Sequence, residues 1–281
     1  MNPDLVFAGG HRMWSVLSRA VTVIVLIGVL VSPARGQMAT GQLGQQPAPP
    51  ANPLAGVEVL VTPYFWGPWI DTTINPSNPR IPSASGTVGF DKIFNHLTWV
   101  PFMGEVEFRD GPYGVLLDYM HAPLKAGINT RGILFGGGTG GMTLDMGTAM
   151  FFYRPIAMPD QYLDVGMGVR AWGFEGGITL NQALLPSFSV TRGTSWADPL
   201  IGFRYHHELG NGFGATAYGD VGGFGVGAHI DWQLIGTIDY AVNSSIDLHA
   251  GFRSVNFTYS LPNAGADIRM NGPLLAATFR F

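Results

Sequence analysis

The sequence predicts an all-β protein, a closed antiparallel β-barrel of about ten strands that crosses a membrane, with eight or twelve strands as alternatives. Charged residues make up 12% of the chain, about half of the ~25% that is usual in soluble domains. Apolar residues occur in short alternating segments separated by Gly, Pro and Asn, which is typical of a membrane barrel. Beyond residue 36, no segment has the ~20 consecutive apolar residues that a membrane helix needs.

The final segment, Asn271 to Phe281, shows the alternation most directly. Its odd positions from Leu275 onward are apolar, whereas Thr278 and Arg280 between them are polar. Alternate residues of a strand point to opposite faces, so one face suits lipid and the other suits a polar interior. In water, so apolar a strand would be an aggregating edge, but in a closed barrel it has a neighbour on each side.

The N-terminal segment predicts export. Residues 20–32 form an apolar run, which Arg12 and Arg19 precede and Ala34-Arg35-Gly36 follows. This order predicts a cleaved signal peptide over residues 1–36. Met13 is an alternative start, and a retained membrane anchor is the alternative to cleavage. Residues 37–56 are rich in Gln and Pro and carry no charge, which predicts a flexible linker. The barrel domain is then residues 57–281.

Ten segments have the pattern of strands. They are residues 57–69, 98–109, 113–121, 142–154, 162–172, 196–207, 213–221, 229–240, 246–259 and the final segment. A helical turn is predicted near Asp91. Connections after the second, fourth, sixth and eighth strands are tight and most of the others are long, as in barrels with short periplasmic turns and longer outer loops. The glycine-rich segment 136–141 is predicted to be a flexible outer loop.

Aromatic residues gather near the tight turns, which favours a membrane-interface girdle. They are Tyr113, Phe152, Tyr153, Tyr162, Tyr205, Phe213 and Tyr240. A soluble β-sandwich, the rival architecture, would also alternate but seldom needs so many strands with aromatic ends.

Charged residues fall on the face of each strand opposite to the apolar residues, and we predict that they form a lumen charge network. Its members are Glu105, Glu107, Asp118, Asp164, Arg170, Asp198, Arg204, Asp220, Asp239, Asp247, Arg253 and Arg280. Charges kept away from lipid would pair across the lumen and fill it, because unpaired buried charges are costly. The alternative is a narrow solute pore lined by both signs of charge.

No catalytic residue is predicted, and we expect that the chain is not an enzyme. Barrel lipases carry a His-x-Ser pair on one strand face, and no histidine here has Ser two residues on. Residues 193–197 approach a nucleophile elbow, but a strand rather than a helix follows them. A lipid-modifying enzyme remains a second alternative.

We also expect no cofactor, no metal and no nucleic-acid partner. His206 and His207 are adjacent in a strand, so they point to opposite faces and suit no common metal ion. The chain has no cysteine, which excludes thiolate ligands, and its formal charge is −4. A mildly acidic chain has no electrostatic reason to bind nucleic acid.

Three features together resemble the small outer-membrane barrels of Gram-negative bacteria, including an uncharacterised group. They are the signal peptide, the alternating final strand that ends on Phe281, and a Phe-Asp-x-Ile segment at residues 90–93 ahead of Gly104-Glu105. The resemblance implies an outer-membrane location, with outer-membrane lipid and lipopolysaccharide as partners. It also implies that Phe279 and Phe281 form an assembly signal for the outer-membrane assembly machinery. The expected role is a structural or surface-interaction barrel.

Overall fold

The computed structural model describes residues 56–78, 80, 82–95, 101–128, 135–182, 187–261 and 264–281. The predicted signal peptide and nearly all of the predicted linker lie outside these residues. Within them, no helix has the length and apolar character to cross a membrane.

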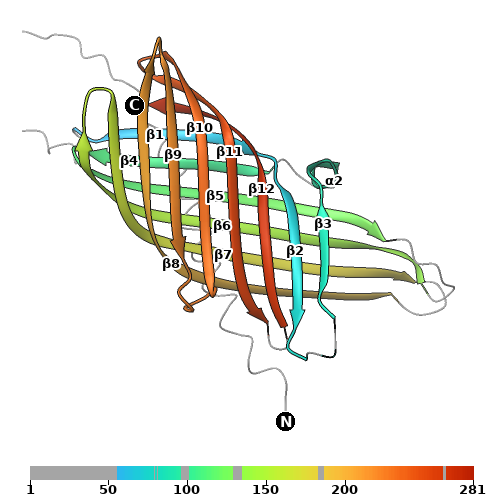
Figure 1. Ribbon diagram of the computed structural model, residues 1–281. Coiled ribbons are helices and arrows are strands. Elements are labelled where there is room, and N and C mark those ends of the chain that lie inside the picture. Colours follow the sequence, from blue (N-terminus) through green and yellow to red (C-terminus); the bar gives the residue numbers. More distant parts are fainter. Residues whose placement is uncertain are drawn as a thin grey trace, which may run out of the picture. The chain divides into compact units, whose positions relative to one another are not determined.

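The described chain is almost entirely β-strand (Figure 1). The strands are β1 Glu58–Trp66, β2 Trp69–Pro76, β3 Ala84–Val88, β4 Phe102–Asp110, β5 Tyr113–Ile128, β6 Phe135–Ala157, β7 Gln161–Gln182, β8 Phe188–Gly210, β9 Phe213–Gly222, β10 Ile230–Asn243, β11 Ile246–Leu261 and β12 Ala264–Arg280. A single short helix, α2 (Phe90–Asn95), lies between β3 and β4 in the described chain.

Ten of these strands close into an antiparallel barrel. Each strand from β4 to β12 pairs with the next one, and β1 pairs with both β4 and β12. The closing register joins Val61 to Val106 on one side and to Phe279 on the other. The predicted ten-stranded closed barrel is therefore confirmed, and the final segment has a partner on each edge.

The sequence analysis missed two strands. It placed no strand between residues 69 and 98, whereas β2 continues β1 beyond Gly67-Pro68 and pairs with the first half of β12. β3 then pairs with β2 outside the ten-stranded barrel. Gly67 is required at the kink because a Cβ there would lie 2.7 Å from the ring of Phe90, which makes an edge-to-face contact with Phe65.

Four connections are tight and lie at one end of the barrel, which we call the tight-turn end; the other is the long-loop end. The four join β4 to β5, β6 to β7, β8 to β9 and β10 to β11. On the long-loop side, several strands are longer than their sequence predicts. The glycine-rich segment 136–141, predicted to be a flexible loop, lies within β6 and pairs with β7. Glycine tolerates an extended backbone, so composition alone did not reveal this strand.

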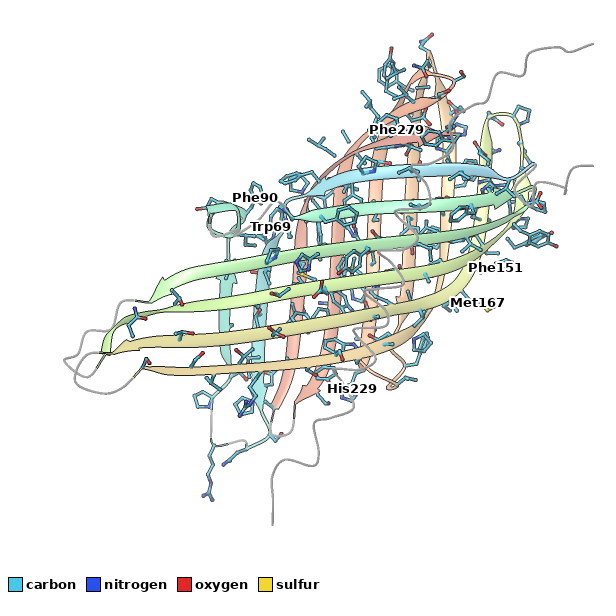
Figure 2. The ribbon with its side chains drawn as sticks, turned by 180° about the vertical axis from the view of Figure 1, so that it is seen from behind. Trp69, Phe90, Phe151, Met167, His229 and Phe279 are labelled. Atoms are coloured by element: carbon cyan, nitrogen blue, oxygen red, sulfur yellow. The ribbon has the colours of Figure 1, made fainter. Side chains whose placement is uncertain are left out.

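The alternation assigns the two faces correctly. Outward side chains such as Met167, Ile201 and Leu234 are more than half exposed, whereas the inward Asp164 and Arg170 are fully buried. Figure 2 shows Phe151 and Met167 on the outer surface of the wall. Lipid-facing and interior-facing residues alternate in this way along membrane barrel strands.

Inside the barrel, a cluster of buried apolar side chains crosses the lumen, and we call it the apolar layer. Its largest members are Trp66, Met103, Met120, Leu144, Met146, Trp172, Phe257 and Met270. These residues come from β1, β4, β5, β6, β7, β11 and β12, so the layer is contributed from most of the circumference. Trp172 and Phe257 are fully buried, with ring centroids 4.6 Å apart. The sequence analysis assigned only polar and charged side chains to the filling of the lumen.

Candidate functional site

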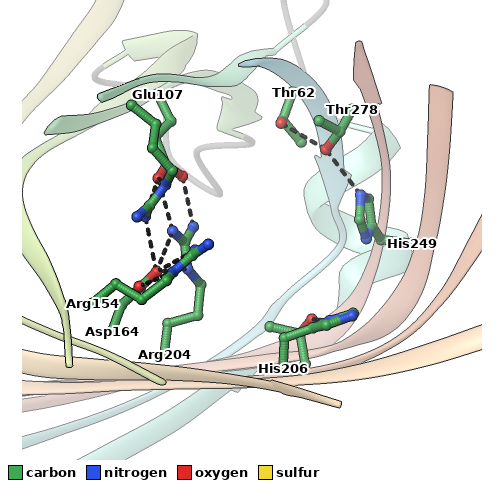
Figure 3. A network of polar contacts seen from close by, with 10 residues as sticks. Thr62, Glu107, Arg154, Asp164, Arg204, His206, His249 and Thr278 are labelled. Atoms are coloured by element: carbon green, nitrogen blue, oxygen red, sulfur yellow. Dashed lines mark hydrogen bonds and ion pairs between the residues drawn. The ribbon is translucent and has the colours of Figure 1, made fainter. Parts of the chain in front are cut away.

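The lumen contains a cavity of about 310 Å³ in the half nearer the tight-turn end. Its lining includes Met158 of the β6–β7 turn and Gly212 of the β8–β9 turn, together with inward side chains of the strands. Two polar clusters face each other across this lumen cavity (Figure 3). We call them the arginine wall and the histidine wall.

The arginine wall joins Arg109, Arg154 and Arg204 to Glu107 and Asp164. Arg204 donates to Glu107 through Nη1 at 2.7 Å and to Asp164 through Nη2 at 2.8 Å. Arg109 Nη2 donates to the same two carboxylates at 2.6 and 2.9 Å, and Arg154 Nε donates to Asp164 at 2.7 Å. Since both carboxylates are saturated by guanidinium donors, this wall is a rigid structural cluster.

The histidine wall is built from four consecutive strands. Asp239 lies opposite His249 in the register of β10 and β11, and Thr278 of β12 comes next. His249 Nδ1 lies 2.7 Å from Asp239 Oδ1, and His249 Nε2 lies 2.9 Å from Thr278 Oγ1. The hydroxyl of Thr62 on β1 lies 2.8 Å from that of Thr278. This wall therefore carries an uninterrupted row of hydrogen bonds from carboxylate to hydroxyl.

Two further hydroxyls, from β9 and β10, donate to Asp239. Thr237 donates to its Oδ1 at 2.7 Å, and Thr216 donates to its Oδ2 at 2.5 Å. His206 Nδ1 lies 2.9 Å from Thr216 Oγ1, and the His206 ring stacks on Tyr162 with centroids 5.1 Å apart. Asp239 is thus fixed in position by partners on several strands.

Two arginines bridge the lumen between the cavity and the apolar layer. Arg170 donates to Asp220 at 2.6 Å and to Asp231 at 2.9 Å. Arg253 donates to Asp118 at 2.9 Å. We call these residues the bridging layer. Because both guanidinium groups are buried with their carboxylate partners, the layer fills the lumen rather than lining an open path.

The remaining members of the predicted charge network lie apart. Asp247 accepts from Arg280 near the tight-turn end. Asp198 accepts from the amide of Ala228 at 2.6 Å at the long-loop end. Glu105 lines the lumen cavity and has neither a hydrogen bond nor an ion pair to any described residue.

Several polar residues of the lumen were not in the predicted network. The alternation places Arg109, Asp231 and His249 inward, and attention to inward histidines and to every inward charge would have included them. Arg154 could not be assigned, because the alternation in its strand is weak and the register shifts between Tyr153 and Ile156.

No family model matches the chain, and no curated protein matches it by sequence. Solved structures do match in fold. The chain is similar to the outer membrane protease OmpT from Escherichia coli, with 7% identity over 80% of this chain and 96% of that one, and a TM-score of 0.51. Others are Ail of Yersinia pestis (10% identity, 80% and 99% coverage, TM-score 0.33) and the translocator domain of NalP from Neisseria meningitidis (12%, 95% and 96%, 0.35).

These comparisons bear on two expectations. The chain has a β-barrel fold like that of OmpT, an outer-membrane barrel, as the sequence resemblance implied. The expectation that the chain is not an enzyme is contradicted, because the solved barrel with the TM-score of 0.51 is itself an enzyme. The likeness is one of fold, so any catalytic group has to be argued from the residues of this chain.

Proposed function

We propose that the chain is an integral outer-membrane β-barrel protein with a sealed lumen, which serves as a structural or surface-interaction barrel and does not conduct solutes. The observation that carries this proposal is the apolar layer, whose Trp172, Phe257 and Met146 have no exposed surface. Side chains that line an aqueous path are wetted, so a layer of fully buried side chains supports a closed lumen.

Residence in a membrane is supported by the outer surface of the barrel. Apolar side chains such as Val165, Met167 and Ile201 cover it and are at least 40% exposed. Of the seven predicted girdle residues, Tyr113, Tyr153, Tyr205, Phe213 and Tyr240 are exposed near the tight turns, which suits an aromatic girdle at a membrane interface. The prediction was wrong for Phe152, which is fully buried, and for Tyr162, which lines the lumen cavity. Outer-membrane lipid and lipopolysaccharide would contact this surface.

The proposed orientation has the tight-turn end in the periplasm, as is usual for these barrels. The long-loop end then faces the exterior. β6 and β8 each have 23 residues, more than twice the ~9–11 that cross a bilayer. The outer parts of β5 to β8 run out together on one side (Figure 1). This sheet would be the surface that the barrel presents to the exterior.

Single-channel recording in planar bilayers tests the sealed lumen. The refolded full-length protein is expected to give no discrete conductance steps over a range of voltages. The double variant Trp172→Ala/Phe257→Ala removes two rings that contact each other in the apolar layer and is expected to give measurable current. Discrete steps from the unaltered protein would refute the proposal.

The matched control is Tyr113→Ala/Phe151→Ala. These two rings are also neighbours, with centroids 6.0 Å apart, but they lie on the outer surface. Their loss should leave the lumen closed. Both variants are first checked for folding by their resistance to protease, and equal currents from both would show that the apolar layer is not the seal.

A further inference from the structure

We infer that Thr278, His249 and Asp239 form a nucleophilic triad that hydrolyses small carboxylic esters in the lumen cavity. This activity goes beyond the proposed function and does not depend on it, because a sealed and a conducting barrel could each contain the triad. Covalent catalysis by a hydroxyl needs an adjacent base, and the base needs a third group that orients it. The histidine wall has these three groups in that order.

The distances between the three side chains match those of a catalytic triad. Thr278 Oγ1 lies 2.9 Å from His249 Nε2, and His249 Nδ1 lies 2.7 Å from Asp239 Oδ1. Both fall within the ~2.6–3.2 Å expected between a nucleophile, its base and the group that orients the base. Strand pairing fixes them, since Asp239 is the register partner of His249 and Thr278 lies diagonal to it on the next strand.

The hydrogen bonds assign the proton positions. A carboxylate only accepts, so the Nδ1 of His249 carries the proton that points to Asp239. In the neutral ring Nε2 is then an acceptor, and the hydroxyl of Thr278 donates to it. Thr62 donates in turn to Thr278 Oγ1 at 2.8 Å. Thr278 therefore has its proton directed at the base and a lone pair supported by a second hydroxyl.

The size of the lumen cavity restricts the class of substrate. Thr62, His249, Asp239 and Thr278 all line it. Its volume of about 310 Å³ lies at the lower end of the ~300–1,000 Å³ that is usual for ligand pockets, so a short-chain ester fits it.

The charged side chains that line the lumen cavity further restrict the class of substrate. The acidic side chains are Glu105, Glu107, Asp118, Asp160, Glu208, Asp239 and Asp247, against Arg204, Arg253 and Arg280. The acidic groups outnumber the arginines, so we expect selection against negatively charged esters and in favour of uncharged ones.

The reaction proceeds in two balanced steps. Thr278 Oγ1 bonds to the acyl carbon while its proton moves to His249 Nε2; the ester C–O bond then breaks, and the leaving alkoxide takes that proton as an alcohol. Water next attacks the acyl group and gives a proton to His249. The bond from the acyl carbon to Thr278 breaks, and Thr278 oxygen regains the proton as the carboxylic acid leaves. Thr62 can turn its hydroxyl toward the oxyanion that develops in each step.

Hydrolysis of p-nitrophenyl acetate by the full-length protein, refolded in detergent micelles, tests the triad. Thr278→Val removes the hydroxyl with little change of shape, and His249→Ala removes the base. Each is expected to lower kcat by ~100-fold or more, in the range for loss of a positioned base. Thr278→Ser keeps the hydroxyl and is expected to retain activity.

A histidine can also react directly with an activated ester, so the matched control is His229→Ala. His229 is an exposed histidine that bonds to Ser260, outside the triad, and its loss should not change the rate. A fluorophosphonate probe followed by peptide mass spectrometry supplies a second readout. The label is expected on Thr278 and is expected to be absent from folded His249→Ala.

The outcomes separate a catalytic role from a structural one. Equal hydrolysis by Thr278→Val and the unaltered protein, or a label on another residue, would overturn the inference. A rate for the unaltered protein no higher than that of micelles alone would do so as well. The conductance measurement is independent of each of these results, so failure of the triad and failure of the sealed lumen are distinguishable.

Discussion

Arg253 of β11 donates through Nη2 to Asp118 Oδ2 of β5 at 2.9 Å, although 135 residues separate them in the chain. On the shorter way around the barrel, β12, β1 and β4 lie between these two strands. The bond therefore crosses the lumen and ties opposite walls together. Arg170 does the same between β7 and β10. Such bridges make the interior rigid, so the loss of one should lower the stability of the barrel.

Arg253→Ala is expected to destabilise the barrel by ~3–5 kcal/mol, because it leaves Asp118 buried without its partner. The measurement is the free energy of unfolding in urea, with the protein in lipid vesicles. Arg192→Ala is the control, since the exposed Arg192 bonds, among the residues that the structure describes, only to the carbonyl of its neighbour Thr191. The double variant Arg253→Met/Asp118→Leu should recover most of the loss. A destabilisation by the single change no larger than that of the control would contradict the bridge.

Met167→Arg tests which side of the wall meets lipid. Met167 points outward at the middle of the predicted membrane-crossing segment 162–172 and is 66% exposed, so a charge there should cost ~2–4 kcal/mol of unfolding free energy. Leu209→Arg puts the same charge beside a tight turn, where the expected cost is ~0–1 kcal/mol. Equal losses of unfolding free energy at the two positions would argue against a membrane around Met167.

Gly251→Ala is expected to cost ~1–3 kcal/mol by overpacking, because a Cβ on Gly251 would lie 2.0 Å from the carbonyl oxygen of Gly236. Gly236→Ala adds the same methyl group where no heavy atom lies within 4 Å, and it should be tolerated. The urea midpoints of the two variants make the comparison. Similar midpoints would mean that the strands separate enough to accept the methyl group.

Phe281→Ala separates assembly from stability. The backbone of Phe281 helps to close the barrel by bonding to Val59 in both directions, at 2.9 and 3.3 Å, although the residue is 78% exposed. The variant keeps both bonds, so its unfolding free energy should change by no more than ~0.5 kcal/mol. If the ring is an assembly signal together with Phe279, the amount of folded protein in the outer membrane should fall severalfold. Leu275→Ala, on the same face of β12, is the control, and equal amounts of both variants would exclude the signal.

The sequence by itself determined the ten strands of the closed barrel and the faces of most of them. Alternation is a local property with a period of two, so the exposed Val165 and the buried Asp164 could be assigned without a structure. Closure also followed, because the final strand is too apolar to be left as an edge. The lengths of β6 and β8 did not follow, since their glycine-rich or polar outer parts show little alternation.

Only the tertiary structure decided which inward residues meet. Asp239, His249, Thr278 and Thr62 are brought into one row by the shear of four strands, and the contact of Arg253 with Asp118 depends on the diameter of the closed barrel. Neither quantity is encoded in any short segment of sequence. The same closure gathers apolar side chains of most strands into the apolar layer. The sequence predicted only the charged part of the interior, because no single strand shows that its apolar inward residues meet those of the other strands. The reason is physical. The face on which a side chain lies depends on its position within its own strand, whereas the residue that it contacts across the lumen depends on all ten strands together.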